Sequence, residues 1–452
     1  MGKNSRETEE LQRGLSNRHI QLIALGGAIG VGLFYGSSST IQMAGPSILI
    51  AYLIGGIVIF TIMRALGEMA VAEPVSGSFS SYANRYLGPF AGYLTGWTYW
   101  FMWVVVGMAE ITVVGVYVNY WYPDIPQWVS ALVALVIITG VNLLNVKAFG
   151  EFEFWFAMIK VVAIIGLIIG GLGMIFFGIG NGGEAIGFEN LWIHGGFMPN
   201  GIEGLLLSLV MVMFSFGGVE LIGITAGEAE NPKKSIPSAI NNVIWRILIF
   251  YIGSLGIMMI LYPWNKIGTE GSPFVLVFDQ IGIPGAAHII NFVVLTAALS
   301  AFNSGMFSTG RMLYNLALQN NGPKYFGKLN KNNTPSRAIL FSSMFLLVAV
   351  VLNYFVPEKV FLYISSVAIV AVVTSWTIIL LTQMKFRKSK TSEEKKQLSF
   401  RMPFFPYTSY FALAFLALII VLMAYIEGMR AAIFVAPVWF VILYIGYRLK
   451  RK

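Results

Sequence analysis

The sequence contains no cysteine, only three histidines and few charged residues. Charged residues make up 11% of its 452 residues, whereas soluble domains carry about a quarter. The absence of cysteine excludes disulfides and thiolate metal sites. The three histidines, His19, His194 and His288, are too scattered to suggest a metal cluster. We therefore expect neither a metal site nor a disulfide framework.

The missing charges are replaced by apolar residues, which make up 57% of the chain and give a mean hydropathy of +0.73. A bilayer accepts outward-facing apolar side chains that water would not, so we expect an all-α integral membrane protein. Runs of about 20 residues, the length of a membrane span, predict twelve transmembrane helices. These are expected near 19–42, 46–66, 90–118, 127–145, 152–178, 201–228, 238–262, 286–316, 337–355, 358–383, 403–427 and 430–448.

The net charge of +9 is explained better by membrane topology than by nucleic-acid binding. Lys and Arg gather in the N-terminal tail (1–18), after spans eight and ten, and in the C-terminal tail (449–452). With twelve spans these segments share one side, and the positive-inside rule makes that side cytoplasmic. The polar N-terminal segment has no cleavage-site pattern, so we expect a retained tail in a multi-pass protein of the cytoplasmic (inner) membrane.

Two glycine clusters interrupt apolar runs at related places. "GGAIGVG" (26–32) lies in span one, "FSFGGVELIG" (214–223) lies in span six, and each internal glycine costs a helix about 1 kcal/mol relative to alanine. Five spans separate the clusters, which predicts two inverted repeats, 19–178 and 201–383, followed by two added spans over 403–448. The alternative is that the glycines only allow helices to pack closely.

A broken membrane helix frees backbone N–H and C=O groups that hydrocarbon cannot hydrate, so protein or ligand must satisfy them. The start of a half-helix suits a carboxylate, and the end of one suits an ammonium group. A zwitterionic amino acid carries both groups. The amides expected to take the carboxylate are those of Gly30, Val31 and Gly32. The carbonyls expected to take the ammonium are those of Ala28, Phe214 and Gly217.

Several strings in the chain resemble bacterial amino-acid permeases of the amino acid/polyamine/organocation superfamily. They are "ALGGAIGVGLFYGS", "MRALGEM", "FGEFEFWF", "GGVELIGITAGEAENPKKSIPSAIN", "LYPWN", "GSPFV" and "NFVVLTAALSAFNSGMFSTGRML". The resemblance runs from about residue 11 to the end and is strongest to the proline-specific branch. It implies a LeuT-type 5+5 inverted-repeat fold with broken helices one and six, and substrate/proton symport.

Three ionisable residues within the expected spans are candidates for the site. Burying the charge of Lys160 in a membrane is costly. The resemblance implies that Lys160 stands where sodium-coupled relatives hold an ion, which makes a sodium site unlikely and H⁺ the coupling ion. The alternative is that its side chain snorkels to the interface. Glu220 follows the second glycine cluster and either accepts backbone hydrogen bonds or exchanges protons. Glu110 lies on a span that lines the substrate pocket in relatives, as a protonatable group or as a polar wall. Phe214 could form an aromatic lid or an ordinary core contact.

The expected function is secondary active import of an amino acid with a proton, proline being the first candidate substrate. Histidine or another neutral amino acid, proton-independent exchange and a transporter-like nutrient receptor remain the alternatives. We expect no enzymatic activity, because no nucleophile, base and metal set is clustered in the sequence. The expected partners are a small amino acid and the lipid bilayer, with no cofactor and no nucleic acid.

Overall fold

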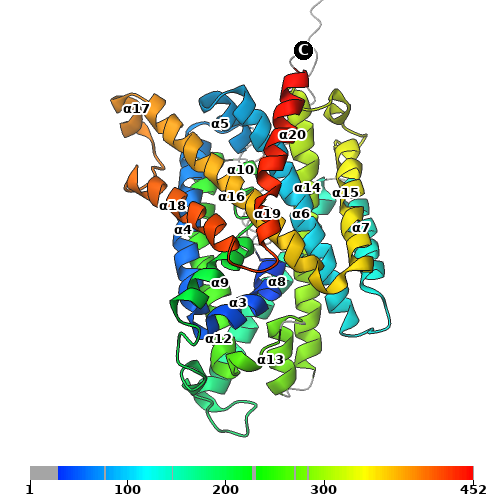
Figure 1. Ribbon diagram of the computed structural model, residues 1–452, viewed down its shortest axis with the longest axis vertical. Coiled ribbons are helices and arrows are strands. Elements are labelled where there is room, and N and C mark those ends of the chain that lie inside the picture. The colour runs from blue at the N-terminus through cyan, green and yellow to red at the C-terminus, as the bar shows by residue number, and fades with distance from the viewer. Residues whose placement is uncertain are drawn as a thin grey trace, which may run out of the picture.

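The computed structural model describes residues 29–75, 78–144, 146–225, 231–268, 271–281 and 285–450, which contain helices and no strands (Figure 1). The expected all-α class is confirmed. The predicted N-terminal tail and the first part of span one, including Ala28, lie outside the described residues.

Nine helical stretches in the described ranges are long and apolar enough to cross a bilayer. The first, Gly36–Ala72, combines α3 (Gly36–Ala44), a 3₁₀ turn and α4 (Ile48–Ala72). Single helices make up α6 (Pro89–Asn119), α7 (Gln127–Leu144), α8 (Val146–Phe177), α14 (Ala286–Leu318), α15 (Ser336–Phe355) and α16 (Pro357–Ser389). The other two stretches are Pro232–Leu261, which holds α11 (Pro232–Arg246) and α12 (Ser254–Leu261), and Arg430–Lys450, which holds α19 (Arg430–Ile433) and α20 (Val435–Lys450).

Two further apolar helices in the described ranges, α9 (Gly201–Ser215) and α18 (Tyr407–Met423), are shorter. Most bounds agree with the expected runs to within a few residues, as for α6 and α7. The helical segments are therefore those that hydropathy predicts, while the count of twelve spans and the LeuT-type arrangement remain predictions.

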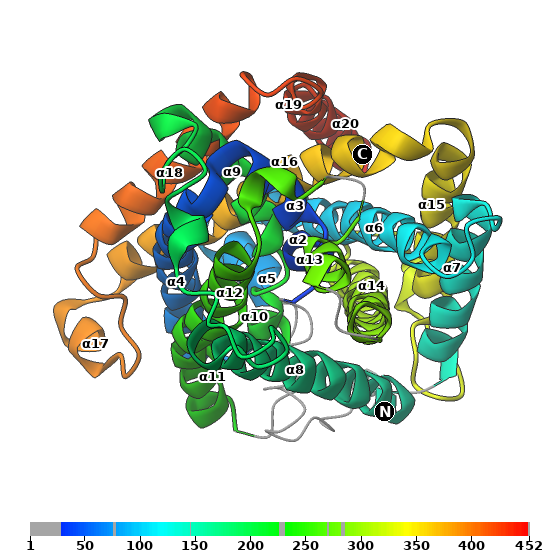
Figure 2. The same cartoon turned by 90° about the horizontal axis from the view of Figure 1, so that it is seen from below.

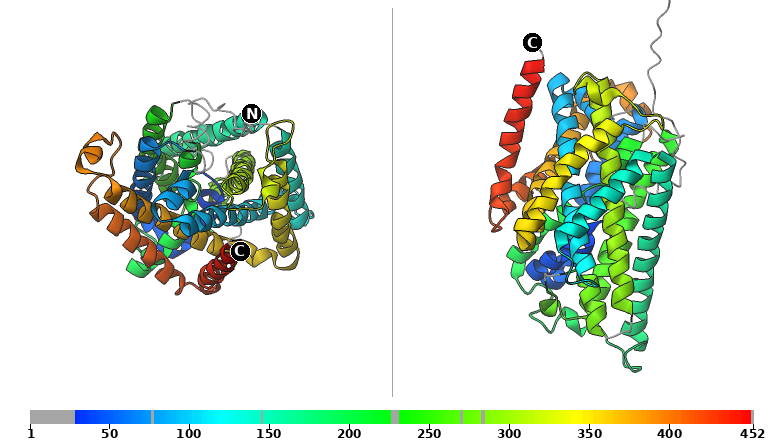
Figure 3. Two further views of the ribbon diagram at one scale, coloured as in Figure 1. Left: turned by 90° about the horizontal axis from the view of Figure 1, so that it is seen from above. Right: turned by 90° about the vertical axis from the view of Figure 1, so that its right-hand side faces the viewer.

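Burial separates the inner helices from the outer ones. In α6, α14 and α16, 78% of the most apolar stretch is buried inside the protein, against 17% for the stretch that contains α20. Figure 2 shows α6 and α14 beside the short helix α2 (Val31–Phe34) near the middle, and Figures 2 and 3 show the red helix α20 at the edge. The central helices surround the place where span one is interrupted.

Short helices lie at the two ends of the bundle. The amphipathic helix α5 (Ser78–Tyr86), α17 (Ser392–Gln397) and the carboxyl end of α20 share one end in Figure 1, and α13 (Pro273–Ile281) lies at the other. The basic segment after span ten is polar and has no apolar run, as is typical of a loop, yet it forms α17. A capping box explains this helix, since Thr391 accepts from the Glu394 N–H and Glu394 accepts from the Thr391 N–H.

Two further features were not predicted from hydropathy. The helix α13 begins at Pro273, and proline is well suited to the first position of a helix. Between α11 and α12 the backbone forms a π-helix over Ile247–Gly253. Apolar periodicity alone does not distinguish this π-helix from continuous α-helix.

Close packing of α9 against α3 depends on Gly204. A Cβ added there would lie 2.1 Å from the carbonyl oxygen of Met43, whereas one added at Gly170 on α8 would meet nothing within 4 Å. We predict that Gly204→Ala lowers the unfolding temperature in detergent, because overpacking of about 1–3 kcal/mol exceeds the gain in helix propensity. Gly170→Ala is the matched control, and equal stability of the two variants would contradict the packing argument.

Candidate functional site

The helix expected over 201–228 is interrupted, as its glycine cluster predicts. Helix α9 ends at Ser215, α10 (Leu221–Thr225) begins at Leu221, and the residues between them are in turns. Gly218 has a φ of 100°, a conformation that side chains with a Cβ rarely adopt. The glycine therefore permits the break.

The outer part of span one also begins with non-helical backbone. Gly30 is extended, with φ −123° and ψ −156°, and the short helix α2 starts at Val31. After a turn at Tyr35 the chain continues as α3. The N-terminal end of this half-helix therefore lies inside the bundle, with Gly30 and Val31 both buried.

The carboxyl group of Glu110 on α6 lies at this helix start. The Val31 N–H donates to Glu110 Oε1 at 3.4 Å, and a Cβ added to Gly30 would lie 2.6 Å from the same oxygen. Glu110 is 3% exposed, and its Oε2 has no hydrogen-bond partner among the described residues. A carboxyl group of the protein thus contacts one of the three amides expected to bind a substrate carboxylate.

Ser215, the last residue of α9, joins the two interrupted spans. Its Oγ donates to the Gly32 carbonyl at 2.8 Å and lies 3.0 Å from the hydroxyl of Tyr52. The Tyr251 hydroxyl donates to the Ser215 carbonyl at 3.0 Å. A Cβ on Gly32 would lie 2.5 Å from the Cα of Ser215. Gly32 thus serves close packing as well as the interrupted backbone, so both interpretations of the glycine pattern apply.

Lys160 on α8 points into the protein and does not snorkel to an interface. It is 1% exposed, and its Nζ donates to the Ile29 carbonyl at 3.1 Å and to Ser300 Oγ on α14 at 2.9 Å. Its ammonium group therefore binds a carbonyl freed just before α2, next to the Glu110 contact. The bond to Ser300 also joins α8 to α14.

Glu220 lies directly after the break in span six and is fully buried. Its Oε2 accepts from the Gly218 N–H and from Trp376 Nε1 on α16, each at 3.2 Å. This arrangement matches the structural alternative, a carboxylate that satisfies an amide freed by the break. A part in proton exchange stays a prediction.

Phe214 and Gly217 lie on either side of the end of α9. The Phe214 carbonyl accepts from the Gly217 N–H at 3.0 Å, which uses part of its acceptor capacity. The ring of Phe214 meets the ring of Phe361 edge to face at 5.9 Å, and Phe361 also contacts Tyr35. These aromatic side chains form a cluster beside both interrupted spans.

The family described as Amino acid permease matches residues 19–452. The chain belongs to the amino acid permease family. It is 60% identical over 442 residues to an uncharacterized amino acid permease of Bacillus subtilis, YtnA, covering 98% of this chain and 96% of the relative.

Two further relatives of the permease have substrates in their names. A probable threonine/serine transporter of Bacillus subtilis, YbxG, is 51% identical over 439 residues, covering 97% of this chain and 95% of its own. The aromatic amino acid transport protein AroP of Escherichia coli is 50% identical over 444 residues, covering 98% and 97%. The permease is therefore a multi-pass membrane protein whose family transports amino acids and is not a family of enzymes.

Ion pairs tie together the end of the permease that carries α5 and α17. Glu68 accepts from Arg387 at 2.5 Å, and Glu73 binds Arg85 at 2.6 Å and Lys390 at 2.9 Å. Burial raises the pKa of Glu73, but hydrogen bonds from Tyr86, Lys390 and Arg85 outweigh it and hold the pKa below its ordinary value. Glu73 is therefore ionised at neutral pH, and its pairing is lost only as the pH falls through that lowered pKa.

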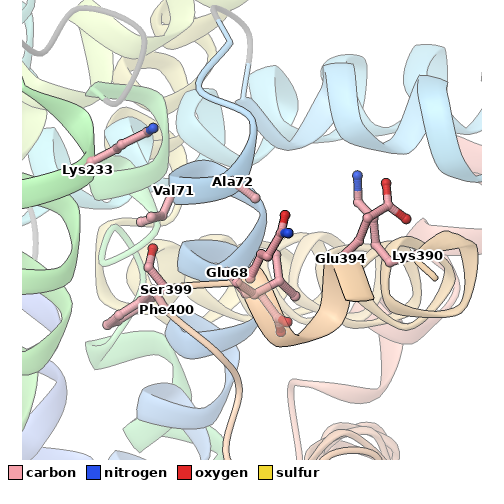
Figure 4. Close-up of a pocket in the computed structure, with 10 residues that line it drawn as sticks. Glu68, Val71, Ala72, Lys233, Lys390, Glu394, Ser399 and Phe400 are labelled. Carbon is pink, nitrogen blue, oxygen red and sulfur yellow. The ribbon is translucent and has the colours of Figure 1, made fainter. Parts of the chain in front are cut away.

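A cavity of about 470 Å³ lies beside these ion pairs and not at the interrupted spans (Figure 4). Glu68, Lys233, Lys390 and Glu394 bring opposite charges to its lining. The segment that contains Glu68 and Glu73 has two interpretations from sequence, ion pairs or ordinary solvated loop charges, with the second as the default. The structure places both acids in ion pairs, Glu68 with Arg387 and Glu73 with Arg85 and Lys390.

Sequence reasoning missed two residues of the site, Ser215 and Glu153. Ser215 is inside the quoted glycine cluster, but a serine before a break is not a distinctive signal. Glu153 had a signal that was not used, because it precedes Lys160 by seven residues, about two helical turns, and so lies on the same face of α8. It is fully buried and accepts from Ser300 Oγ at 2.7 Å.

We predict that Gly32→Ala abolishes substrate binding while the permease still reaches the membrane. The added methyl group would overlap the backbone of Ser215 and force α2 away from α9. Binding is measured by isothermal titration or thermal shift with purified protein. Gly166→Ala on α8, where a Cβ meets nothing within 4 Å, is the control. Unchanged affinity in Gly32→Ala would show that this close contact is dispensable.

Glu220 allows its structural and protonic roles to be separated. We predict that Glu220→Ala destabilises the permease by about 1–3 kcal/mol, because the Gly218 N–H and the Trp376 indole lose a buried acceptor. Glu220→Gln keeps an acceptor oxygen and retains most of that stability, as measured by thermal unfolding. If the glutamine variant is as unstable as the alanine variant, hydrogen bonding to the break is not what Glu220 supplies.

Proposed function

We propose that the permease is a secondary active transporter that imports an amino acid together with a proton. The observation that carries this proposal is the buried Lys160 ammonium bound to the Ile29 carbonyl, one residue before the interrupted backbone at Gly30. A group that can gain and lose a proton thereby holds the segment proposed to bind the substrate.

The substrate is proposed to lie between the two interrupted spans. Its carboxylate takes amides of Gly30, Val31 and Gly32 at the start of α2, where the half-helix carries partial positive charge. Its ammonium group donates hydrogen bonds to backbone carbonyls. The proposed acceptors are the carbonyls of Phe214 and Gly217 near the end of α9, and that of Ala28 in span one. The aromatic cluster of Phe214, Phe361 and Tyr35 then covers the bound molecule.

Glu110 gives the site a way to respond to a substrate. Its carboxyl group contacts the Val31 N–H that the proposal assigns to the substrate carboxylate. Binding therefore requires Glu110 to yield this donor or to become protonated, because two carboxylates do not share a buried amide without repulsion. This competition supports a role for Glu110 at the substrate site.

Proton coupling follows from the bonds of Lys160. When the amine is charged it holds the Ile29 carbonyl and Ser300 together; when it loses its proton, the attraction to the carbonyl weakens and the segment before α2 is released. Moving one charge inward yields about 2.3 kcal/mol per 100 mV, which allows roughly 40-fold accumulation of a zwitterion. One proton is enough for concentrative uptake.

The fold proposed for this mechanism is the LeuT-type arrangement. Residues 19–178 and 201–383 form two inverted repeats of five spans each, and residues 403–448 add two more. Both termini are proposed to lie in the cytoplasm, which places α5, α17 and the carboxyl end of α20 inside the cell. Support comes from the two interruptions at related positions and from the basic residues gathered at that end.

The proposed substrate class is an amino acid with an uncharged side chain. Two relatives whose names give substrates are a probable threonine/serine transporter and an aromatic amino acid transport protein, which fits such a class. Proline, from the sequence resemblance, is the first to test, and histidine follows. A proton-independent exchanger would transport without a gradient, and a receptor would bind without accumulating.

Uptake into proteoliposomes tests the coupling. With an imposed inward proton gradient we predict concentrative uptake of proline or a competing neutral amino acid, and Lys160→Met is predicted to abolish accumulation because no proton can be carried at this site. Lys359→Met, at an exposed lysine, is the control. Undiminished accumulation in Lys160→Met would remove this residue from the mechanism.

A further inference from the structure

A chain of hydrogen bonds leads from Lys160 to a second buried ionisable group. Lys160 Nζ donates to Ser300 Oγ at 2.9 Å, and Ser300 Oγ donates to Glu153 Oε1 at 2.7 Å. Each donor therefore points toward Glu153. We propose that Glu153 is the proton acceptor through which Lys160 is deprotonated, with Ser300 as the link, so that this carboxyl group is the exit of the proton path. The inference rests on the proposed function.

The position of Glu153 suits an exit toward the cytoplasm. It lies on the same face of α8 as Lys160 and about 10 Å nearer the start of that helix, at a rise of about 1.5 Å per residue. In the proposed topology that helix begins at the cytoplasmic side. A proton that moves from Lys160 to Glu153 therefore leaves the interrupted spans and approaches the inner surface.

Polar side chains on α14 face the second carboxyl oxygen of Glu153. Asn303 and Ser304 interact with this carboxyl group through side-chain hydrogen bonding, although Glu153 Oε2, Asn303 Nδ2 and Ser304 Oγ form no hydrogen bond of full geometry in the described part of the chain. Such donors can hold the carboxylate and can rearrange when it takes up a proton.

Polar groups continue from Asn303 toward the basic end of the bundle. Asn142 Nδ2 on α7 donates to Asn303 Oδ1 at 2.8 Å. Asn142 also lines a cavity of about 10 Å³ together with Phe149, Arg311 and Thr334. A cavity of this size is near the smallest that holds one water molecule. Water that entered past this cavity would take the proton from the Glu153 carboxyl group.

Besides Lys160 and Glu153, the charged residues Glu110 and Arg311 lie near this path. On α8, Glu153 interacts with Lys160, and on α6, Glu110 also interacts with Lys160. On α14 the guanidinium of Arg311 lies over the ring of Phe307 at 3.1 Å, and that ring stacks on Phe149 at 3.8 Å. The path from Glu153 therefore ends beside the cation of Arg311.

The transfer balances without any other reactant. An N–H bond of the Lys160 ammonium breaks and an O–H bond forms at Ser300 Oγ, while the original Ser300 O–H breaks and a new O–H forms at Glu153 Oε1. Lys160 becomes a neutral amine, Glu153 becomes a carboxylic acid, and Ser300 regains a hydroxyl group. Glu153 then loses its proton to water and returns to a carboxylate.

The test compares two transport modes of the full chain in proteoliposomes. Gradient-driven net uptake requires Lys160 to release its proton inside, whereas exchange of external for internal substrate does not. For Glu153→Gln we expect the initial rate of net uptake to fall roughly 10²-fold, with exchange retained. Glutamine accepts the Ser300 hydrogen bond but takes up no proton. Glu153→Asp, which retains a carboxyl group, is expected to restore part of the net uptake.

The control is Glu151→Gln, which removes an exposed carboxyl group two residues away on the same helix. It is expected to leave both modes unchanged. If Glu153→Gln keeps net uptake, or loses net uptake and exchange in parallel, the relay is wrong and Glu153 is dispensable or only structural. The proposed function fails separately, if the unmodified permease shows no gradient-driven accumulation or Lys160→Met retains it.

If Glu153→Gln does not reach the membrane, Ser300 provides a second pair of variants that test the relay. Ser300→Ala removes the link and is expected to slow net uptake while sparing exchange. Ser300→Thr keeps the hydroxyl group and is expected to restore net uptake. Equal net uptake by the alanine and threonine variants would overturn the link through Ser300.

Discussion

The backbone polar groups freed where two membrane helices are interrupted control the rest of this structure. Hydrocarbon offers them no hydrogen bonds, so side chains from other helices must do so. Ser215 binds the Gly32 carbonyl, Lys160 binds the Ile29 carbonyl, and Glu220 binds the Gly218 amide. Charged and polar residues are costly inside a membrane, and these three are retained there in contact with backbone that would otherwise be unsatisfied.

Glycine makes these contacts short enough to form. The two interrupted spans approach so closely that no side chain fits between Gly32 of span one and Ser215 of span six. The outer parts of the same spans approach as closely at Gly204. Close approach replaces the apolar driving force that helices lack in lipid. Packing and interruption are thus two effects of the same residues, which explains why sequence alone could not choose between them.

The sequence predicts the helices and both glycine clusters well, because apolar run length and glycine density are local properties. It also identifies Lys160, Glu110 and Glu220, since an ionisable residue inside an apolar run is conspicuous. It does not predict which groups they contact. The bond from Lys160 to Ser300 joins residues 140 positions apart, and that from Val31 to Glu110 spans 79. Such pairings depend on how α2, α6, α8 and α14 pack together. The helix α17 was missed because a charged segment suggests a loop, although its capping box was readable.

The contact between Glu110 and the Val31 amide has a consequence for affinity. In the proposed site, a ligand carboxylate that entered at this donor would displace the Glu110 carboxyl group, so the free energy gained would be a difference between two interactions. Tight binding would thereby be limited, and the bound molecule could leave again when Glu110 returned. A carrier needs such a limit, because a ligand held too strongly would stop turnover at the inner surface.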